Sequence, residues 1–131
     1  IIPLGRLANF TNGELFGRIT DLPLGVVFEG VDQHLRHPSQ IYEAVAEGPL
    51  ILLIMYVFSR KRNFIKNQTP GIFAAKYIII YCILRFFVEF TREPDAFLGF
   101  IGPWEVLTLG QVLCLIFLLS GLIFFRKLKH N

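Results

Sequence analysis

Two opposite charges stand four residues apart at the end of an apolar stretch. Arg85 and Glu89 close a hydrophobic run that begins near Ile72, and Tyr81 precedes Arg85 by about one helical turn. This spacing places the side chains on one face of a helix. A charge inside a spanning helix costs about 2.5–3.5 kcal/mol on insertion scales, so such residues normally face a bundle interior or a water-filled cavity. The pattern therefore predicts either an ion pair that joins two helices or a polar membrane pocket that holds an anionic group.

A second dense group of polar residues occupies positions 5–17. Its side chains include one cation, two amides and one acid: Arg6, Asn9, Asn12 and Glu14. Glycines at 5, 13 and 17 permit tight turns and close backbone approach, so we expect a loop here. The forked donors of Arg6 and Arg85 suit phosphate oxygens. Since Glu14 and Glu89 can hold those guanidinium groups in place, the two segments together predict a pocket for a phospholipid headgroup.

The composition indicates an all-α integral membrane protein rather than a soluble domain. Of the 131 residues, 53% are hydrophobic, and 14 of them are Phe. Three transmembrane helices are predicted, at about 44–59, 72–91 and 105–125, although the first is short against the roughly 20 residues that a span needs. Residues 1–43 are predicted to form a small extramembrane excursion, with a possible short strand at 25–28. The apolar start of the chain is typical of the tail of an earlier segment, so we expect a fragment of a longer protein.

Basic residues cluster after the first and third predicted spans, at 60, 61, 62 and 66 and at 126, 127 and 129. With three spans, both clusters lie on the same side, and the positive-inside rule makes that side cytoplasmic. Residues 1–43 and the loop 92–104 then face outward. At ~1.5 Å per helical residue, Arg85 lies roughly 9 Å below the outer end of its span. Because topology accounts for the basic residues, no nucleic-acid partner is expected.

Other reactive side chains have structural explanations. Pro38 in the stretch 37–43 is typical of a helix start, and His37 beside it is more often a cap or hydrogen-bonding residue than a base. Cys82 and Cys114 lack a Cys-x-x-Cys pair or metal-ligand spacing, which predicts two buried structural thiols. Since the sequence contains no metal set, nucleotide motif or Ser-His-Asp arrangement, we expect no metal and no cofactor.

Three further polar residues lie in or beside the predicted spans. Glu43 and Glu47 share one helix face near the outer surface. Gln111 lies within the third span, where a hydrogen bond to another helix is a better explanation than a ligand contact.

The stretch from Gly5 to Gly17 resembles the signature of the prolipoprotein diacylglyceryl transferases, Gly-Arg-x-(Gly/Ala)-Asn-Phe-x-Asn-x-Glu-x-x-Gly. The sequence matches this signature at every fixed position. Residues 37–43, 85–95 and 110–111 are also similar to that family, in the same order along the chain. The resemblance covers nearly the whole chain, and its thirteen-residue motif is highly specific.

The resemblance implies a bacterial inner-membrane enzyme of about seven spans, of which this chain is the C-terminal portion, acting at the periplasmic face. It implies transfer of the diacylglyceryl group of phosphatidylglycerol to the lipobox cysteine of preprolipoproteins, with a thioether and glycerol phosphate as products. The implied partners are phosphatidylglycerol, preprolipoprotein signal peptides and membrane lipid. By motif position, the expected catalytic residues are Arg6, Glu14, Arg85 and Glu89. The expected substrate-binding residues are Arg6, Asn9, Asn12, Gly17, His37, Tyr81 and Arg85.

The mechanism that we expect is displacement at the glycerol carbon by the substrate thiolate. Arg6 and Arg85 would neutralise the departing phosphate, and Glu14 or Glu89 would orient them or take the thiol proton. A His-Gly-Gly-rich stretch of the family's N-terminal half is absent from these residues, and neither His34 nor His37 replaces it.

Rival classes remain open on the sequence alone. A transporter or channel fragment would place Arg85 and Glu89 on its conduction path and would form no covalent product. A non-catalytic remnant would bind phosphatidylglycerol without transferring it, and a different lipid-transferring enzyme would differ in its lipid specificity.

Overall fold

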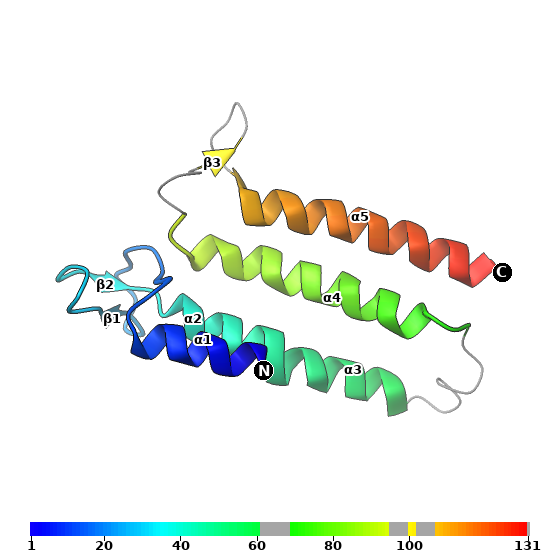
Figure 1. Cartoon of the computed structure of the whole chain (residues 1–131), viewed down its shortest axis with the longest axis horizontal. Coiled ribbons are helices and arrows are strands. Elements are labelled where there is room, and N and C mark those ends of the chain that lie inside the picture. Colours follow the sequence, from blue (N-terminus) through cyan, green and yellow to red (C-terminus); the bar gives the residue numbers. More distant parts are fainter. Residues whose placement is uncertain (61–68, 95–99, 102–106, 131) are drawn as a thin grey trace.

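The chain folds as a row of long helices with a small lobe at one end (Figure 1). The computed structural model describes residues 1–60, 69–94, 100–101 and 107–130. Two candidate membrane-crossing helices are found among these residues, at Ser39–Arg60 and Leu109–Lys129. The expectation of a mostly helical protein of membrane type is therefore confirmed at this level of detail.

The helix at Ser39–Arg60 consists of three consecutive elements. An α-helix, α2 (Ser39–Val45), passes into a π-helical turn, η1 (Ala46–Leu50), and then into α3 (Ile51–Arg60). Pro49 lies inside η1, where it offers no backbone N–H and displaces the preceding turn, so the regular α-helical hydrogen bonding is interrupted. The helix starts directly after Pro38 and is longer than the predicted span of 44–59, which left out its polar first turn.

Two further long helices pack against each other. They are α4 (Ile72–Val88), which ends in a 3-10 turn, η2 (Glu89–Thr91), and α5 (Leu109–His130). Gly121 lets the helices approach closely, because a Cβ there would lie 3.2 Å from Ile79. The predicted segment 72–91 matches α4 and η2 together. The predicted span of 105–125 begins outside the described residues. It ends five residues before the end of α5, because no helix-breaking residue follows Phe125.

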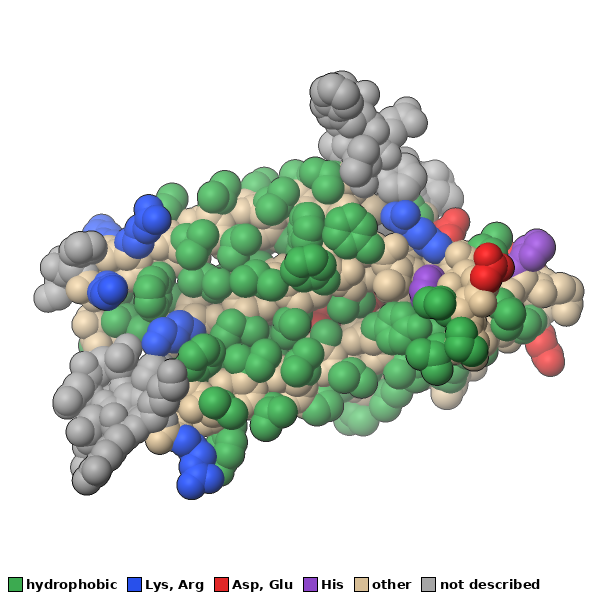
Figure 2. Space-filling view, turned by 180° about the vertical axis from the view of Figure 1, so that it is seen from behind, with side chains coloured by type: hydrophobic (Ala, Val, Ile, Leu, Met, Phe, Trp, Pro, Cys, Tyr) green, Lys and Arg blue, Asp and Glu red, His purple; other side chains and the backbone are tan. Residues whose placement is uncertain are grey.

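The surface of the long helices is apolar. Leu52 and Ile123 are each 68% exposed, and Figure 2 shows hydrophobic side chains over most of the helical surface. Soluble monomers rarely expose continuous apolar surface on this scale, whereas a helix in lipid requires it. Cys82 and Cys114 are both free and buried, so the prediction of two buried thiols is confirmed.

The basic ends of the helices lie together. Figure 1 shows the end of α3, the start of α4 and the C-terminus at the same end of the molecule. Arg60 closes α3, and the last turns of α5 contain Arg126, Lys127 and Lys129. The remaining basic residues of the first cluster, at 61, 62 and 66, lie outside the described residues.

The other end of the molecule contains a lobe, residues 12–38, which includes one short strand pair, and a second strand pair outside the lobe. Strand β1 (Val26–Val27) pairs antiparallel with β2 (Leu35–Arg36), and β3 (Phe100–Ile101) pairs with β4 (Leu107–Thr108). The possible strand at 25–28 is thus confirmed in β1. The expectation of a loop over 5–17 is wrong for its first half, because Ile2–Thr11 form a helix, α1. Its Pro3 stands in the first turn, where a missing N–H costs nothing.

Candidate active site

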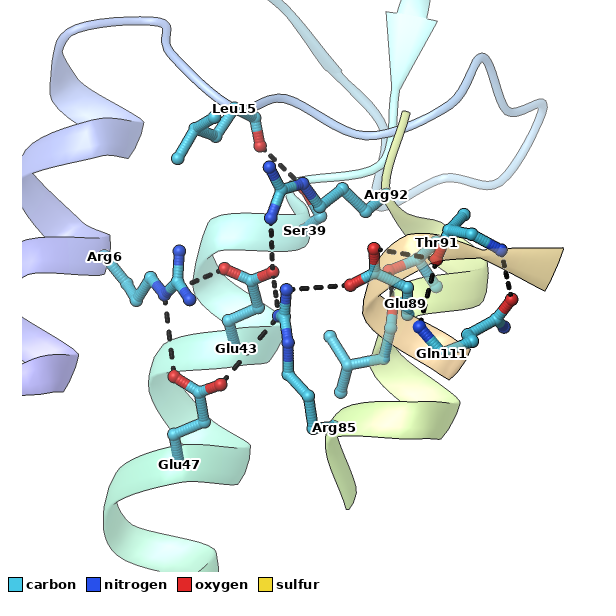
Figure 3. A network of polar contacts seen from close by, with 12 residues as sticks. Arg6, Leu15, Ser39, Glu43, Glu47, Arg85, Glu89, Thr91, Arg92 and Gln111 are labelled. Carbon is cyan, nitrogen blue, oxygen red and sulfur yellow. Dashed lines mark hydrogen bonds and ion pairs between the residues drawn. The ribbon is translucent and has the colours of Figure 1, made fainter. Parts of the chain in front are cut away.

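A cluster of buried charges lies where α1, the α2–η1 helix and α4 meet (Figure 3). Its arginines are Arg6, Arg85 and Arg92, and its acids are Glu43, Glu47 and Glu89. Three positive and three negative formal charges sum to zero, so the cluster is balanced within itself. Balance is required here because an unpaired charge in a low-dielectric interior is strongly destabilising.

Glu43 is the common partner of all three arginines. Its side chain is 1% exposed, and its Oε2 lies 2.9 Å from Nε of Arg6. Its Oε1 forms a short ion pair with Nη1 of Arg85 and lies 4.0 Å from Nη1 of Arg92. Glu43 therefore fixes guanidinium groups from α1 and from the end of α4 in one place.

Arg6 reaches the cluster because α1 crosses the π-helical turn closely. A Cβ at Gly48 would lie only 2.5 Å from Cγ of Pro3, so glycine is needed at this crossing. The two ion pairs described for Arg6 both run through Nε. Since its side chain is 21% exposed, the guanidinium group of Arg6 can also donate to an anion outside the cluster.

Glu47 faces the cluster from the π-helical turn. It lies 3.5 Å from Nε of Arg6 and 3.8 Å from Nη1 of Arg85, and it accepts a 3.3 Å hydrogen bond from the hydroxyl of Tyr81. Its ion pairs are longer than the closest ion pairs of Glu43 and Glu89. Glu47 is therefore the most loosely held of the three acids.

Glu89 connects the cluster to the start of α5. Its Oε2 lies 2.7 Å from Nη2 of Arg85, and its Oε1 accepts a 3.1 Å hydrogen bond from Thr108. Gly110 makes room for this carboxylate, because a Cβ there would lie 2.8 Å from Oε1. The expected pairing of Arg85 with Glu89 is thus present in the structure.

The lobe is fastened to the end of α4 by backbone contacts around Gly17. Its N–H donates to the carbonyl of His37 at 3.0 Å, and the N–H of Arg18 donates to the carbonyl of Thr91 at 3.0 Å. A Cβ on Gly17 would collide with the His37 carbonyl and would lie 2.6 Å from the Thr91 carbonyl oxygen. Three segments therefore cross at a point that admits no side chain.

A buried arginine stabilises the lobe itself. Arg36 pairs with Asp32 at 2.7 Å and with Glu93 at 3.3 Å, and it donates to the carbonyl of Gly17 at 3.1 Å. Its guanidinium also covers the ring of Phe16 at 4.8 Å from the centroid. Hydrogen bonding from Arg36 lowers the pKa of Asp32 below its ordinary value of 3.8.

A cavity of about 450 Å³ lies between α4 and α5 beside the cluster. Tyr81 and Arg85 form its polar part, and most of the remaining wall is apolar, including Ile78, Leu113 and Phe117. A largely apolar space with a cationic group in its wall is compatible with a molecule that carries an acyl chain and an anionic group. The arrangement combines fixed guanidinium donors, buried carboxylates and a largely apolar cavity.

Comparison with known proteins gives a consistent assignment. A family model described as prolipoprotein diacylglyceryl transferase matches residues 2–126. The chain is 47% identical over 120 residues to the phosphatidylglycerol--prolipoprotein diacylglyceryl transferase of Geobacter sulfurreducens. The aligned region covers 91% of this chain and 43% of that protein. Relatives with the same name in Rickettsia bellii and Polynucleobacter asymbioticus are each 43% identical over 126 residues, covering 93% and 96% of this chain. This chain belongs to the prolipoprotein diacylglyceryl transferase family.

The match covers this chain nearly completely but not its relatives. The chain spans less than half the length of the curated relatives that it matches, with 46% covered in both Rickettsia bellii and Polynucleobacter asymbioticus. Family members are named as transferases that act between phosphatidylglycerol and prolipoproteins. The resemblance first seen in the residues at 5–17 is confirmed by these comparisons.

The family motif at 5–17 contributes to the site unevenly. Arg6 lies in the cluster, and Gly17 lies at the crossing of the lobe and α4. Asn9 is half-buried on α1, whereas Asn12 is exposed and lines a separate surface hollow of about 470 Å³ beside β1. The structure therefore brings Arg6 and Arg85 together, as expected, but keeps Asn12 outside their cluster.

The expected role of Glu14 as an arginine partner is wrong for the described residues. Its side chain is exposed, and no ion pair to Arg6 or Arg85 is found for it. The backbone turns back after α1, so the carbonyl of Glu14 faces α2 and accepts a 2.7 Å hydrogen bond from Gln40. Glu43 and Glu47 occupy the place that the sequence suggested for Glu14.

Sequence reasoning missed Glu43 and Glu47 as members of the cluster. The four-residue spacing of Glu43 and Glu47 on one helix face was the available signal, but it was attributed to the outer surface. The expectation for Gln111 also needs correction. Its Oε1 accepts a 3.0 Å hydrogen bond from the N–H of Thr108, so Gln111 stabilises the start of its own helix.

His37 joins the lobe to α2 through its backbone. Its carbonyl accepts hydrogen bonds from Gly17 and from Ser39, and its ring packs at 6.0 Å from that of Tyr42. Its Nδ1 is buried without a hydrogen-bond partner among the described residues. Pro38 occupies the N-cap of α2 and no side chain caps the helix there, so the capping interpretation is wrong and the hydrogen bonds described for His37 run through its backbone.

Proposed function

We propose that this protein transfers the diacylglyceryl group of phosphatidylglycerol to the cysteine thiol of a preprolipoprotein lipobox. The products are a thioether-linked lipid on the protein and glycerol phosphate. One observation carries the proposal: arginines from two separated family motifs, Arg6 and Arg85, meet at a single buried cluster beside a largely apolar cavity. A transporter would need neither this arrangement nor the match to the family's motifs.

The chemical step is displacement at the glycerol carbon. The thiolate sulfur forms a bond to that carbon while the bond from carbon to phosphate oxygen breaks, and its electron pair leaves on the phosphate. Arg85 and Arg6 stabilise the charge that develops on the departing phosphate. Since their guanidinium groups are already held by carboxylates, no reorganisation is needed when the charge appears.

The balanced cluster also explains how phosphate can be both bound and released. Three carboxylates compete with the phosphate for the same arginine donors, so the anion is not held by an unpaired excess of charge. The guanidinium group of Arg6, whose side chain is 21% exposed, can also donate to a headgroup outside the cluster. In this account Arg6 contacts the substrate phosphate first and Arg85 stabilises its departure.

The other motif residues have supporting roles in this proposal. Tyr81, which donates a hydrogen bond to Glu47, and Asn9 on α1 would orient the lipid or thiol, and Gly17 with His37 would hold the lobe over the site. Asn12 would contact the peptide substrate from the lobe. Glu14 would act through its backbone, which is bonded to Gln40.

We propose three spans for this chain within a complete bundle of about seven, located in the bacterial inner membrane. The helices of the second and third predicted spans, together with Ser39–Arg60, would cross the bilayer, and residues 1–43 would lie at the periplasmic face. The basic helix ends support this orientation, because cytoplasmic flanks are enriched in Lys and Arg. The charge cluster then opens toward the periplasm, where lipobox peptides emerge.

A transfer assay tests the function directly. The complete gene product is placed in vesicles of phosphatidylglycerol with a lipobox peptide, and the peptide mass is measured. We expect the mass of a diacylglyceryl adduct, and none when the peptide cysteine is replaced by serine. If the folded protein forms no adduct even with the cysteine peptide, the transferase function is excluded.

A further inference from the structure

The buried acid Glu47 has a longer closest ion pair than either of the other two acids in the cluster. Its Oε2 is buried and has no hydrogen-bond partner among the described residues, and the nearest arginine nitrogen lies 3.5 Å away. The Oε2 atoms of Glu43 and Glu89 are also buried without a hydrogen bond among the described residues, but they lie only 2.9 Å and 2.7 Å from an arginine nitrogen, so ion pairing compensates them more strongly than Glu47. Leaving a buried carboxylate oxygen without a donor is costly, so its retention needs an explanation.

The backbone at Glu47 is also irregular. Glu47 belongs to the π-helical turn η1, whereas Glu43, one turn earlier, lies in regular α-helix. π-Helical turns are frequent at functional sites because they reorient a side chain within an otherwise regular helix. From this turn the carboxylate of Glu47 faces Tyr81 and Arg85 on α4 and Arg6 on α1.

The group that Glu47 meets on α4 is the hydroxyl of Tyr81. The hydroxyl donates to Oε1 of Glu47 at 3.3 Å, and Tyr81 also forms part of the wall of the cavity between α4 and α5. Arg85, one turn later, lines the same cavity. The Tyr81 hydroxyl therefore connects the cavity to the carboxylate of Glu47, which does not line the cavity.

We propose that Glu47 is the proton acceptor of the transfer reaction and that Tyr81 relays the proton to it from the substrate thiol. This inference rests on the proposed function and adds to it the group that activates the nucleophile. As the thiol approaches, its proton passes to the Tyr81 oxygen while the Tyr81 hydroxyl proton passes to Glu47. The thiolate then attacks the glycerol carbon, the bond from carbon to phosphate oxygen breaks, and the electron pair leaves on the phosphate. Glu47 finally returns the proton to the departing glycerol phosphate, so atoms and charge balance.

The other acids of the cluster fit this role less well. Glu43 contacts Arg6, Arg85 and Arg92, and protonating it would weaken its ion pairs with all three guanidinium groups. Glu89 is held by Arg85 and by the hydroxyl of Thr108. Glu47 can accept a proton without breaking any of these close contacts.

The test compares two nucleophiles in the complete gene product. Phosphatidylglycerol vesicles are supplied with a lipobox peptide that contains either cysteine or selenocysteine, whose selenol is more acidic and ionises without a base. In Glu47→Gln we expect thiol transfer to fall by about 100-fold or more, the range of general-base catalysis, and the selenol to restore most of the rate. Glu43→Gln should lose activity with both nucleophiles, because it disorders the arginines. Asp21→Asn, at an exposed position of the lobe, is the control and should be unchanged.

A pH profile provides a second readout. Without a base, thiol transfer by Glu47→Gln should rise as pH approaches the ordinary pKa of a thiol, about 8.5. The charged or titratable groups that face Glu47 are Arg6 on α1, Glu43 on α2, and Tyr81 and Arg85 on α4. All of them remain in this variant, so the comparison isolates Glu47.

The outcomes separate the inference from the proposed function. No adduct from the wild-type protein would defeat the function itself. An active wild type with equal loss for thiol and selenol in Glu47→Gln would overturn the inference and make Glu47 a positioning residue. If Glu47→Gln fails to accumulate, Tyr81→Phe is measured instead, with the same selenol rescue expected and unchanged thiol activity contradicting the relay.

Discussion

At the scale of residues, the site depends on guanidinium groups that are fixed before substrate arrives. Arg85 contacts Glu43, Glu47 and Glu89 while its side chain is only 11% exposed. A planar fork can satisfy several carboxylate oxygens at once, and the ammonium group of lysine cannot. The identity of the cation therefore matters as much as its charge.

We expect Arg85→Lys to lower transfer by about 100-fold or more, comparable to removal of one preorganised donor from a charge-stabilising site. The charge is kept, so the protein should still accumulate in the membrane. The matched control is Arg60→Lys, an exposed position whose described contacts are with Tyr56 of its own helix. Rates of adduct formation in phosphatidylglycerol vesicles measure both variants. A lysine variant as active as the control would remove Arg85 from the mechanism.

Residue-level reasoning from sequence found the cations better than the acids. Arg6, Arg85 and Glu89 were correctly grouped because opposite charges in apolar segments need partners. Glu14 was assigned to them by proximity in sequence to Arg6, and only the turn after α1 takes it away. Glu43 and Glu47 could not be chosen over it, because the crossing of α1 over Gly48 depends on backbone approach that spacing alone does not reveal.

At the scale of elements, the lobe must be held against the end of α4. Gly17 is the contact point, with the His37 and Thr91 carbonyls on either side. We expect Gly17→Ala to loosen the lobe by overpacking, which typically costs about 1–3 kcal/mol, and to lower transfer at least several-fold. Limited proteolysis within residues 18–36 and the transfer rate measure the effect.

The matched control for this change is Gly30→Ala. A Cβ at Gly30 would meet no atom within 4 Å among the described residues, so the same substitution should leave the lobe intact. Equal protease resistance of the two variants would contradict the account of the crossing.

The pairing of Asp32 with Arg36 predicts a pH dependence of the lobe. The pKa of Asp32 in the folded protein lies below its ordinary value of 3.8. Its contribution to stability is therefore complete above that value and is lost as pH falls through the lower folded pKa. We expect pepsin cleavage of the lobe to increase as pH drops below about 3.8, and Asp32→Asn to be cleaved more readily at higher pH with a weaker pH dependence. Identical pH profiles for the two proteins would contradict this role.

Whole elements were largely predictable from the sequence, and their ends were not. The apolar runs located α4, α5 and most of Ser39–Arg60. The polar first turn of α2 was left out because its side chains are buried by the cluster rather than by lipid. Helix α1 was read as a loop because glycines and amides in a short segment favour turns, whereas packing of Pro3 against Gly48 favours the helix.

At the scale of the whole molecule, the proposal requires the lobe and the basic helix ends to lie on opposite sides of the membrane. Single cysteines at Asp21 in the lobe and Lys129 in α5 test this, with Cys82 and Cys114 replaced by alanine. In intact cells, an impermeant maleimide should label only the lobe position, and labelling at 129 should need opened membranes. Labelling of both positions in intact cells would contradict the orientation.

The central claim is that the arginine–glutamate cluster performs the transfer of a diacylglyceryl group. Its most direct test is the adduct yield of the complete gene product and its Arg85→Ala variant, measured by mass spectrometry on the same lipobox peptide in phosphatidylglycerol vesicles. The account predicts an adduct from the wild-type protein and none above background from a variant recovered in equal amount from the membrane. An undiminished adduct from Arg85→Ala would contradict it.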